Sequence, residues 1–304
     1  MGICESRSGE TKNNTNNIPP IVIHFENNGV KKPEIMFDGI HSHIPDEKLA
    51  IISNQKEKSI CKITINKESK GTGFGTGFLC IIGECKKIKC LVTAYHVLDE
   101  EQLKFGNEIK ITFNDGKKSK IIKMDGSRCI YASEKDDITI IEIKDNDKLN
   151  NYDALEIDSN LYKNYINFFE EYNSKIVYIL HYPEGNIINF SQNNIVDIDN
   201  NNNIYHKCAT EVGSSGAPIL NLDTLKVIGV HRGGGCFEKE KFHNEIIKKY
   251  NNDFDKENKL KCNIGKIMKE SIINFNKENK IILTIKINED DIGKKNRRRI
   301  KFKF

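Results

Sequence analysis

Short runs of β-branched and aromatic residues recur through the middle of the chain, separated by Gly, Asn and Asp. Each run has four to seven residues, which is the length of a strand and too short for an amphipathic helix. The number of these runs and the turn-forming residues between them predict an antiparallel β sandwich or barrel. The runs are 60–65, 77–82, 88–94, 109–113, 138–143, 176–180, 217–220 and 227–230.

Helical spacing of apolar residues appears only late in the chain. It is present over 242–250 and is clearer over 264–275, where Ile264, Met268, Ile272 and Phe275 fall on one helical face. The sequence therefore predicts an all-β domain that ends with a helix.

Two segments flank this domain. Residues 1–57 are rich in Asn, Lys, Pro and Glu and lack sustained periodicity, so we interpret them as an amino-terminal tether. The folded domain is expected over 58–278. Residues 279–304 alternate like a strand and then carry the basic run 294–299, which is typical of a solvated tail and could also contact anionic lipid.

Composition excludes several functional classes. The 304 residues contain 47 Lys and Arg against 43 Asp and Glu, a net charge of +4 that does not indicate a nucleic-acid partner. No apolar run reaches the length of a membrane span, and the first residues lack the apolar stretch of a secretory signal. We therefore expect a cytoplasmic protein.

Neither the cysteines nor the glycines indicate a cofactor. The nine cysteines are scattered without paired CxxC spacing, which favours buried thiols in a reducing compartment over a metal site or a disulfide framework. The glycine-rich segment 71–77 precedes a predicted strand, whereas phosphate-binding glycine loops open a helix. We expect no metal and no cofactor.

Three segments carry candidate chemistry. Ser214 and Ser215 lie between Gly213 and Gly216 directly before a predicted strand, where small neighbours would let backbone amides converge on a reacting oxygen. Taken alone, this segment could equally be an ordinary Gly/Ser loop. A serine nucleophile needs a base and a carboxylate that orients the base. His96 ends an apolar strand, and Asp136 and Asp137 precede another one.

The motifs TAYHVL (93–98), DITIIEI (137–143) and GSSGAP (213–218) together resemble the signatures of chymotrypsin-like (trypsin-fold) serine peptidases. GTGFLC (75–80) and VIGVHRGG (227–234) resemble the neighbouring strands of that family. The resemblance spans about residues 58–276 and implies two antiparallel six-stranded barrels with a carboxy-terminal helix and an active site between the barrels.

The resemblance also implies residue roles. His96 would be the general base, Asp137 its orienting carboxylate, and Ser215 the nucleophile, since the family places that serine directly before Gly-x-Pro. Amides of Gly213 and Ser215 would form the oxyanion hole. Asp136 remains an alternative carboxylate because it adjoins Asp137.

Pocket residues suggest a substrate preference. Ala209 stands where a carboxylate would select Lys or Arg, whereas Thr210 and His231 resemble the Thr/His pair of glutamyl endopeptidases, which select Glu or Gln. Both side chains can donate hydrogen bonds to a carboxylate or an amide. Alternatively, Thr210 is a turn residue and His231 caps a strand.

The amino terminus matches a lipidation pattern. Gly2 and Ser6 fit the myristoylation motif, and Cys4 is a candidate for palmitoylation. One acyl chain binds membranes only marginally, with an association constant of about 10⁴ M⁻¹, so the cysteine would supply the second anchor. This pattern predicts attachment to the cytoplasmic face of a membrane.

Two functions are therefore consistent with the sequence. The first is a serine endopeptidase that acts on polypeptide substrates. The second is a catalytically silent adaptor of the same fold that holds an extended peptide by strand addition. The presence of all three triad residues favours the endopeptidase.

Overall fold

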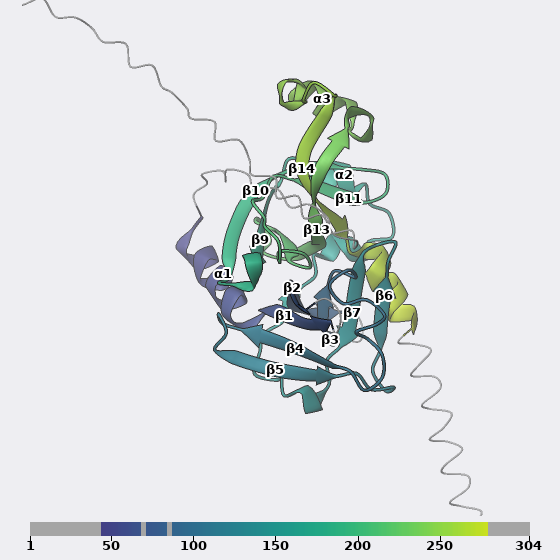
Figure 1. Cartoon of the computed structure of the whole chain (residues 1–304). Coiled ribbons are helices and arrows are strands. Elements are labelled where there is room, and N and C mark those ends of the chain that lie inside the picture. The colour runs from purple at the N-terminus through teal and green to yellow at the C-terminus, as the bar shows by residue number, and fades with distance from the viewer. Residues whose placement is uncertain (1–43, 68–70, 84–86, 279–304) are drawn as a thin grey trace, which may run out of the picture.

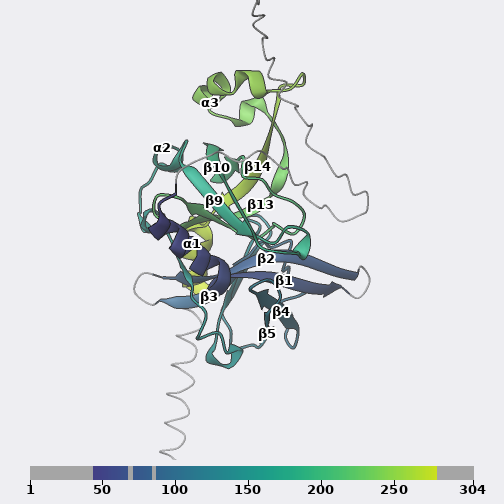
Figure 2. The same cartoon turned by 90° about the vertical axis from the view of Figure 1, so that its left-hand side faces the viewer.

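The computed structural model describes residues 44–67, 71–83 and 87–278. Gly2, Cys4 and the tail 279–304 lie outside these residues. The described chain forms two β-sheets that lie one above the other, with helices at the periphery (Figures 1 and 2). The predicted all-β, trypsin-like fold class is confirmed.

The first sheet forms the lower half of Figure 1. Seven antiparallel strands follow the order β5-β4-β1-β2-β3-β7-β6, and a parallel eighth, β8, pairs with β2. The strands are β1 (Ile60–Lys67), β2 (Gly71–Ile82), β3 (Ile88–Thr93), β4 (Glu108–Phe113), β5 (Lys118–Lys123), β6 (Ile130–Ser133), β7 (Ile138–Glu142) and β8 (Leu155–Glu156).

This sheet differs from the six-stranded barrel predicted from the sequence. Its hydrogen-bonded path has two ends, at β5 and β6, and it contains more than six strands. The sequence pattern of β5 explains one end: four of its residues are exposed and only Ile122 is buried. A strand with charged, exposed residues leaves its outer edge to solvent.

The second sheet is a closed barrel of six strands, as expected, in the order β10-β11-β14-β13-β12-β9. In Figure 1 it forms the upper half, and the long arms of β13 and β14 extend beyond it toward α3. Its strands are β9 (Ile176–His181), β10 (Asn189–Ile198), β11 (Asn203–His206), β12 (Pro218–Asn221), β13 (Val227–Glu238) and β14 (Lys259–Ile267).

The helices depart from the sequence prediction at two places. The segment predicted as a tether contains α1 (Asp46–Lys58), whose Ile52 and Gln55 are buried. Gln55 donates to the carbonyl of Leu225 (3.0 Å) and accepts from the hydroxyl of Tyr178 (2.7 Å), so α1 is attached to the barrel. Leu49 and Ile51 are apolar but exposed, so the apolar residues of α1 do not all lie on its buried face. The sequence therefore shows no clear helical periodicity here.

The predicted final helix begins later than expected. Residues up to Ile267 belong to β14, and the chain is helical over 269–278. Met268, Ile272 and Phe275 are buried in the core that joins the two sheets. The shorter helices are α2 (Phe168–Tyr172) and α3 (Asn244–Lys249), the latter within the predicted helical segment 242–250.

The described helices and cysteines bear on two predictions, the absence of a membrane span and the burial of the thiols. None of the described helices has the length and apolar character needed to cross a membrane. Six of the seven described cysteines are buried free thiols, and Cys236 is exposed.

Candidate active site

His96 lies in the turn that follows β3. The amides of Val97 and Leu98 both donate to the carbonyl of Ala94, at 3.1 and 3.2 Å. These three apolar residues are buried, so they hold the turn against the core, while 32% of the His96 side chain is exposed. The turn therefore holds the imidazole in a fixed position at the surface.

Asp137 lies directly before β7, which pairs with β3 in antiparallel register, Thr93 opposite Thr139. Because the strands run in opposite directions, the segment after β3 meets the segment before β7. The Asp137 carboxylate accepts hydrogen bonds from His96 Nδ1 (2.9 Å to Oδ1, 3.0 Å to Oδ2) and from the His96 amide (3.0 Å). Its side chain is 3% exposed.

These contacts determine the chemistry of the imidazole. A carboxylate only accepts, so Nδ1 carries the proton of this hydrogen bond. In the neutral ring the basic nitrogen is then Nε2. The pair has the form of a general base held by a buried carboxylate.

Asp136 has different partners. Its carboxylate accepts from the hydroxyl of Tyr131 (3.1 Å) and lies 3.4 Å from the ammonium of Lys266 on β14. The two adjacent carboxylates thus have different partners, and Asp137 is the one that meets the imidazole.

The loop that carries Ser215 contacts both sheets. The amide of Thr76 on β2 donates to the Ser215 carbonyl (2.9 Å), and the amide of Gly216 donates to the carbonyl of His231 on β13 (2.8 Å). Gly216 has φ 89°, and a Cβ there would lie 2.2 Å from both the Thr76 carbonyl and Thr93 Oγ1. Only glycine allows this approach to the end of β3, three residues before His96.

The two adjacent serines face different surroundings. Ser215 is 9% exposed, and its hydroxyl donates to the carbonyl of Arg232 at a long 3.4 Å. Ser214 is fully buried; its oxygen lies 2.7 Å from His181 Nδ1 and accepts from the amide of Glu211 (3.1 Å). Ser214 and His181 therefore form a structural contact inside the barrel.

Burial keeps His181 neutral. Desolvation, with a smaller effect of the neighbouring His231, lowers the pKa of His181 to about 3. A neutral, buried imidazole satisfies the Ser214 hydroxyl without bringing a charge into the core.

Arg232 is part of the site, although no motif in the sequence indicated it. Its Nε donates to Asp137 Oδ2 at 3.2 Å, and its side chain is 15% exposed. The sequence shows only an arginine on a strand. Its contact with Asp137 depends on the position of β13 in the barrel relative to the start of β7 in the first sheet.

The predicted pocket residues lie on neighbouring strands and loops of the barrel. Thr210 is 2% exposed and His231 is fully buried, whereas Ala209 is partly exposed and its amide donates to Ser191 Oγ (2.7 Å). His231 Nδ1 lies 3.2 Å from Nε2 of the buried His206.

A chain of hydrogen bonds assigns the protons on these histidines. The amide of Cys208 donates to His206 Nδ1 (3.2 Å), so the His206 proton is on Nε2 and is donated to His231 Nδ1. Burial lowers the pKa of His206 well below its usual range, which keeps that ring neutral. In neutral His231 the proton is then on Nε2, so this nitrogen is a donor.

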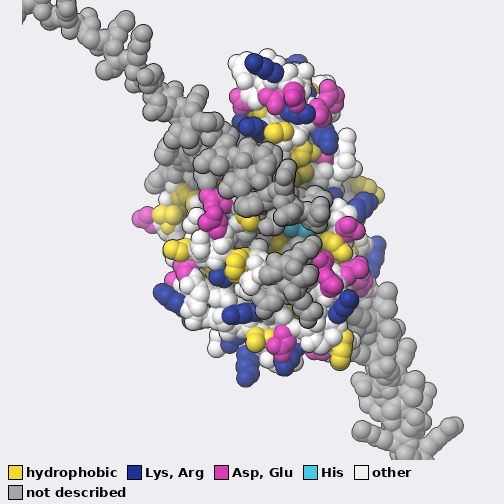
Figure 3. Space-filling model, viewed as in Figure 1, with side chains coloured by type: hydrophobic (Ala, Val, Ile, Leu, Met, Phe, Trp, Pro, Cys, Tyr) yellow, Lys and Arg dark blue, Asp and Glu magenta, His cyan; other side chains and the backbone are white. Residues whose placement is uncertain are grey.

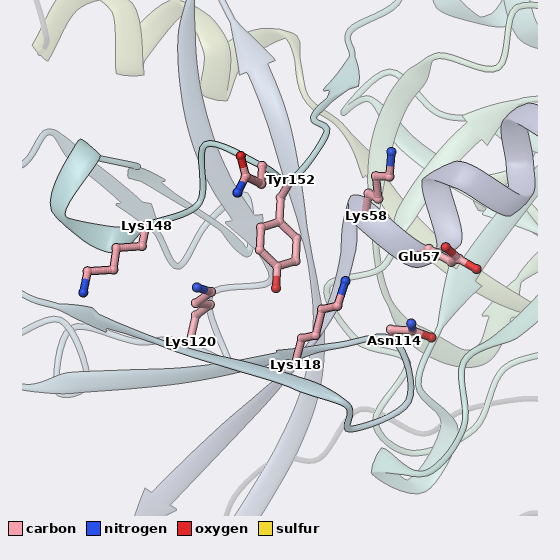
Figure 4. A pocket seen from close by; sticks show the side chains of 8 residues that line it. Glu57, Lys58, Asn114, Lys118, Lys120, Lys148 and Tyr152 are labelled. Atoms are coloured by element: carbon pink, nitrogen blue, oxygen red, sulfur yellow. The ribbon is translucent and has the colours of Figure 1, made fainter.

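Two surface cavities are present among the described residues. One, of about 240 Å³, is bordered by Lys118 and Lys120 of β5, by Lys148 and Tyr152 of the segment between β7 and β8, and by the end of α1 (Figure 4). The other, of about 420 Å³, lies over β11 and β13 and has Arg232 in its wall. Among the described residues no group of three or more His, Cys, Asp or Glu side chains could hold a metal ion.

Histidine is visible at the surface between the barrel and the first sheet on the face shown in Figure 3. The His96–Asp137 pair belongs to the first sheet, and the Ser215 loop precedes β12 of the barrel. The structure thus brings His96 and Asp137 into direct contact, and it links the Ser215 loop to the first sheet through the bond from the Thr76 amide to the Ser215 carbonyl.

One family model matches the sequence. The family model for the lysyl endopeptidase C-terminal domain matches residues 45–246, more than half of the chain. The range includes α1, His96, Asp137 and Ser215. No curated protein matches the sequence.

Solved structures with a similar chain path are distant in sequence. The serine endoprotease from Yersinia pestis is 11% identical with a TM-score of 0.49, over 78% of this chain and 68% of that chain. An HtrA-type protease with a tripeptide is 13% identical with a TM-score of 0.47, over 74% and 61%. Deg5 is 17% identical with a TM-score of 0.43, over 62% and 85%.

Proposed function

The chain belongs to the lysyl endopeptidase C-terminal domain family of trypsin-like serine endopeptidases, and on this basis we propose that it hydrolyses peptide bonds through His96, Asp137 and Ser215. The observation that carries the proposal is the hydrogen bond between His96 Nδ1 and Asp137. It leaves Nε2 as the basic nitrogen, on a partly exposed ring at the junction of the two sheets.

The proposed reaction has two steps. Nε2 of His96 takes the proton of the Ser215 hydroxyl as its oxygen attacks the scissile carbonyl, and then gives that proton to the leaving amine. Water, activated by the same nitrogen, hydrolyses the acyl-enzyme. Asp137 stabilises the imidazolium that forms in each step without taking its proton.

Backbone amides of Gly213 and Ser215 are proposed as the oxyanion hole. The chain is left-handed at Gly213, with φ 96°, and a Cβ there would lie 2.6 Å from the carbonyl of Tyr182. This geometry supports the glycine-dependent turn that such a hole needs. Losing one donor of this kind costs about 10²–10³ in kcat.

The nucleophile assignment is tested by hydrolysis of a denatured protein substrate. Ser215→Ala and His96→Ala should lose activity, while Ser214→Ala, the matched control in the same loop, should retain it. Activity that survives in Ser215→Ala and disappears in Ser214→Ala would refute the assignment.

For the residue on the amino side of the cleaved bond, P1, we propose Glu or Gln. The proton on His231 Nε2 and the hydroxyl of Thr210 support this preference, because both groups are of the kind that donates to an oxygen of a substrate side chain. The family name of the relatives suggests Lys instead. Lysine would place a cation beside these donors.

Peptides that differ only at P1 distinguish the two preferences. We expect kcat/KM for Glu or Gln to exceed that for Lys, and Thr210→Val to reduce it by about tenfold, as loss of one hydrogen bond to a polar group predicts. Preferential cleavage after Lys would refute this preference without affecting the proposed triad.

We also propose that acylation at Gly2 and Cys4 attaches the enzyme to the cytoplasmic face of a membrane. Fractionation of cells expressing the parent and Gly2→Ala tests it. An identical distribution of both proteins would exclude acylation at Gly2 as the anchor.

A further inference from the structure

Arg232 occupies a β-bulge in β13. In the pairing with β14, His231 lies opposite Gly265 and Gly233 lies opposite Ile264, so Arg232 is the extra residue between them. A bulge leaves one residue outside the ladder and redirects its side chain. Here that side chain extends from the barrel to the first sheet.

The guanidinium of Arg232 connects two groups. Its Nε donates to Asp137 Oδ2 and its Nη1 donates to Asn203 Oδ1 on β11, each at 3.2 Å. Asn203 therefore holds the guanidinium from the barrel side while Asp137 holds it from the side of the site. Both ends are anchored, and little of the side chain is exposed.

We propose that Arg232 is a positioning residue that holds the Asp137 carboxylate and weakens its attraction for a protonated His96, so that the enzyme remains active at lower pH. This inference rests on the proposed function, in which His96 must be neutral to accept the Ser215 proton.

The direction of the effect follows from the charges. Oδ2 of Asp137 is shared by His96 Nδ1 (3.0 Å) and Arg232 Nε (3.2 Å). Arg232 is permanently cationic, so it stabilises the carboxylate and repels an imidazolium that shares it. Arg232 thereby favours the neutral, catalytically competent ring, and the acid limb of the activity profile moves to lower pH.

Other charged and titratable groups lie on the elements that flank the pair, but all of them are retained when Arg232 alone is changed. They come from the turn after β3, from the turn before β7, and from β6 and β14. These groups are Tyr95, Asp99, Glu100, Tyr131, Glu134, Asp136 and Lys266.

Two substitutions separate the effect of the positive charge of Arg232 from that of its planar guanidinium. Arg232→Gln removes the cation and keeps an amide that can donate to Asp137. Arg232→Lys keeps the cation and loses the planar fork that also reaches Asn203. Lys241→Gln is the matched control, because Lys241 borders the same cavity as Arg232 and its loss removes one positive charge without altering the contact with Asp137.

The experiment measures the second-order rate constant for labelling by an uncharged fluorophosphonate from pH 4 to 9. Each rate constant is corrected for the fraction of the protein that can be labelled at all. We expect the midpoint of the acid limb to rise by about one pH unit in Arg232→Gln, as the loss of one neighbouring charge predicts. Arg232→Lys should stay within a few tenths of the parent, as should Lys241→Gln.

Coincident acid limbs for Arg232→Gln and the parent would overturn the inference, as would an equal shift in Arg232→Lys. If Arg232→Gln does not fold, the profile of Arg232→Lys still decides: a parent-like midpoint supports the charge effect and a raised midpoint refutes it. Failure of the proposed function looks different, since Ser215→Ala would then still label.

Discussion

Asp137 accepts hydrogen bonds from two different atoms of His96, the backbone amide (3.0 Å) and ring Nδ1 (2.9 Å). The amide contact fixes the carboxylate relative to the main chain of the very residue whose ring it orients. Ring and carboxylate therefore keep their relationship even if neighbouring side chains move, which is the preorganisation that a general base needs.

Asp137→Asn should reduce kcat by about 10⁴-fold. In serine proteases with this pair the amide stabilises the wrong imidazole tautomer while the geometry remains intact. Asp136→Asn is the matched control, since its side chain contacts Tyr131 and Lys266 and not His96. Steady-state kinetics on one peptide measures both variants. Equal losses in the two would contradict the assignment of Asp137.

Gly216→Ala should abolish labelling or folding. A Cβ would meet two oxygens at 2.2 Å, and the positive φ of 89° disfavours any side chain. Gly73→Ala is the control within β2, where a Cβ would have no heavy atom within 4 Å. Circular dichroism and labelling of the two variants make the comparison, and a fully active Gly216→Ala would show that the loop does not need this close approach.

The free energy of unfolding should fall as the pH is lowered from about 6.5 toward 3, in part because of His181. Its pKa is lowered to about 3 in the folded state from the ordinary 6.5, so over this range the unfolded state binds a proton that the folded state does not. This difference costs about 2 kcal/mol between pH 7 and pH 5. Urea denaturation at both values measures it.

His181→Gln supplies the comparison for that experiment. Glutamine can still bond to Ser214 but does not titrate, so the variant should lose about 2 kcal/mol less than the parent over the same interval. An identical pH dependence in parent and variant would contradict the linkage to His181.

Thiol reactivity should distinguish Cys236 from the other described cysteines. Cys236 is exposed, whereas burial raises the pKa of Cys61, Cys80, Cys208 and Cys262, and the thiolate is the reactive form. Native protein treated with a maleimide at pH 7.5 and analysed peptide by peptide should carry label at Cys236. Equal labelling of the buried cysteines without denaturant would contradict their burial.

The sequence predicted strands best where apolar residues are dense. The expected runs 60–65 and 88–94 correspond closely to β1 and β3. Both strands bury apolar residues in the core that joins the two sheets and in the second core of the first sheet. In contrast, β5 was missed because its only buried residue is Ile122, and β10 because it contains three asparagines. A strand at a sheet edge, or one that buries polar side chains as β10 buries Ser191, Asn193 and Asp197, carries too few apolar residues to show its period.

Within the site, the sequence indicated which residue types could cooperate but not all of their partners. His96 and Asp137 follow and precede strands that pair in antiparallel fashion, so their meeting could be anticipated from the chain order. The contact of Arg232 with Asp137 could not, because it depends on one bulged residue in β13. The His206–His231 contact was also not anticipated, since it arises from strands far apart in the sequence.

Mapping the site of covalent modification tests the central claim most directly. The parent protein, labelled with a fluorophosphonate and digested, should yield a single modified peptide with the adduct on Ser215 Oγ, and His96→Ala should yield none at the same exposure. An adduct on Ser214, or on a serine outside the 209–217 loop, would contradict the account.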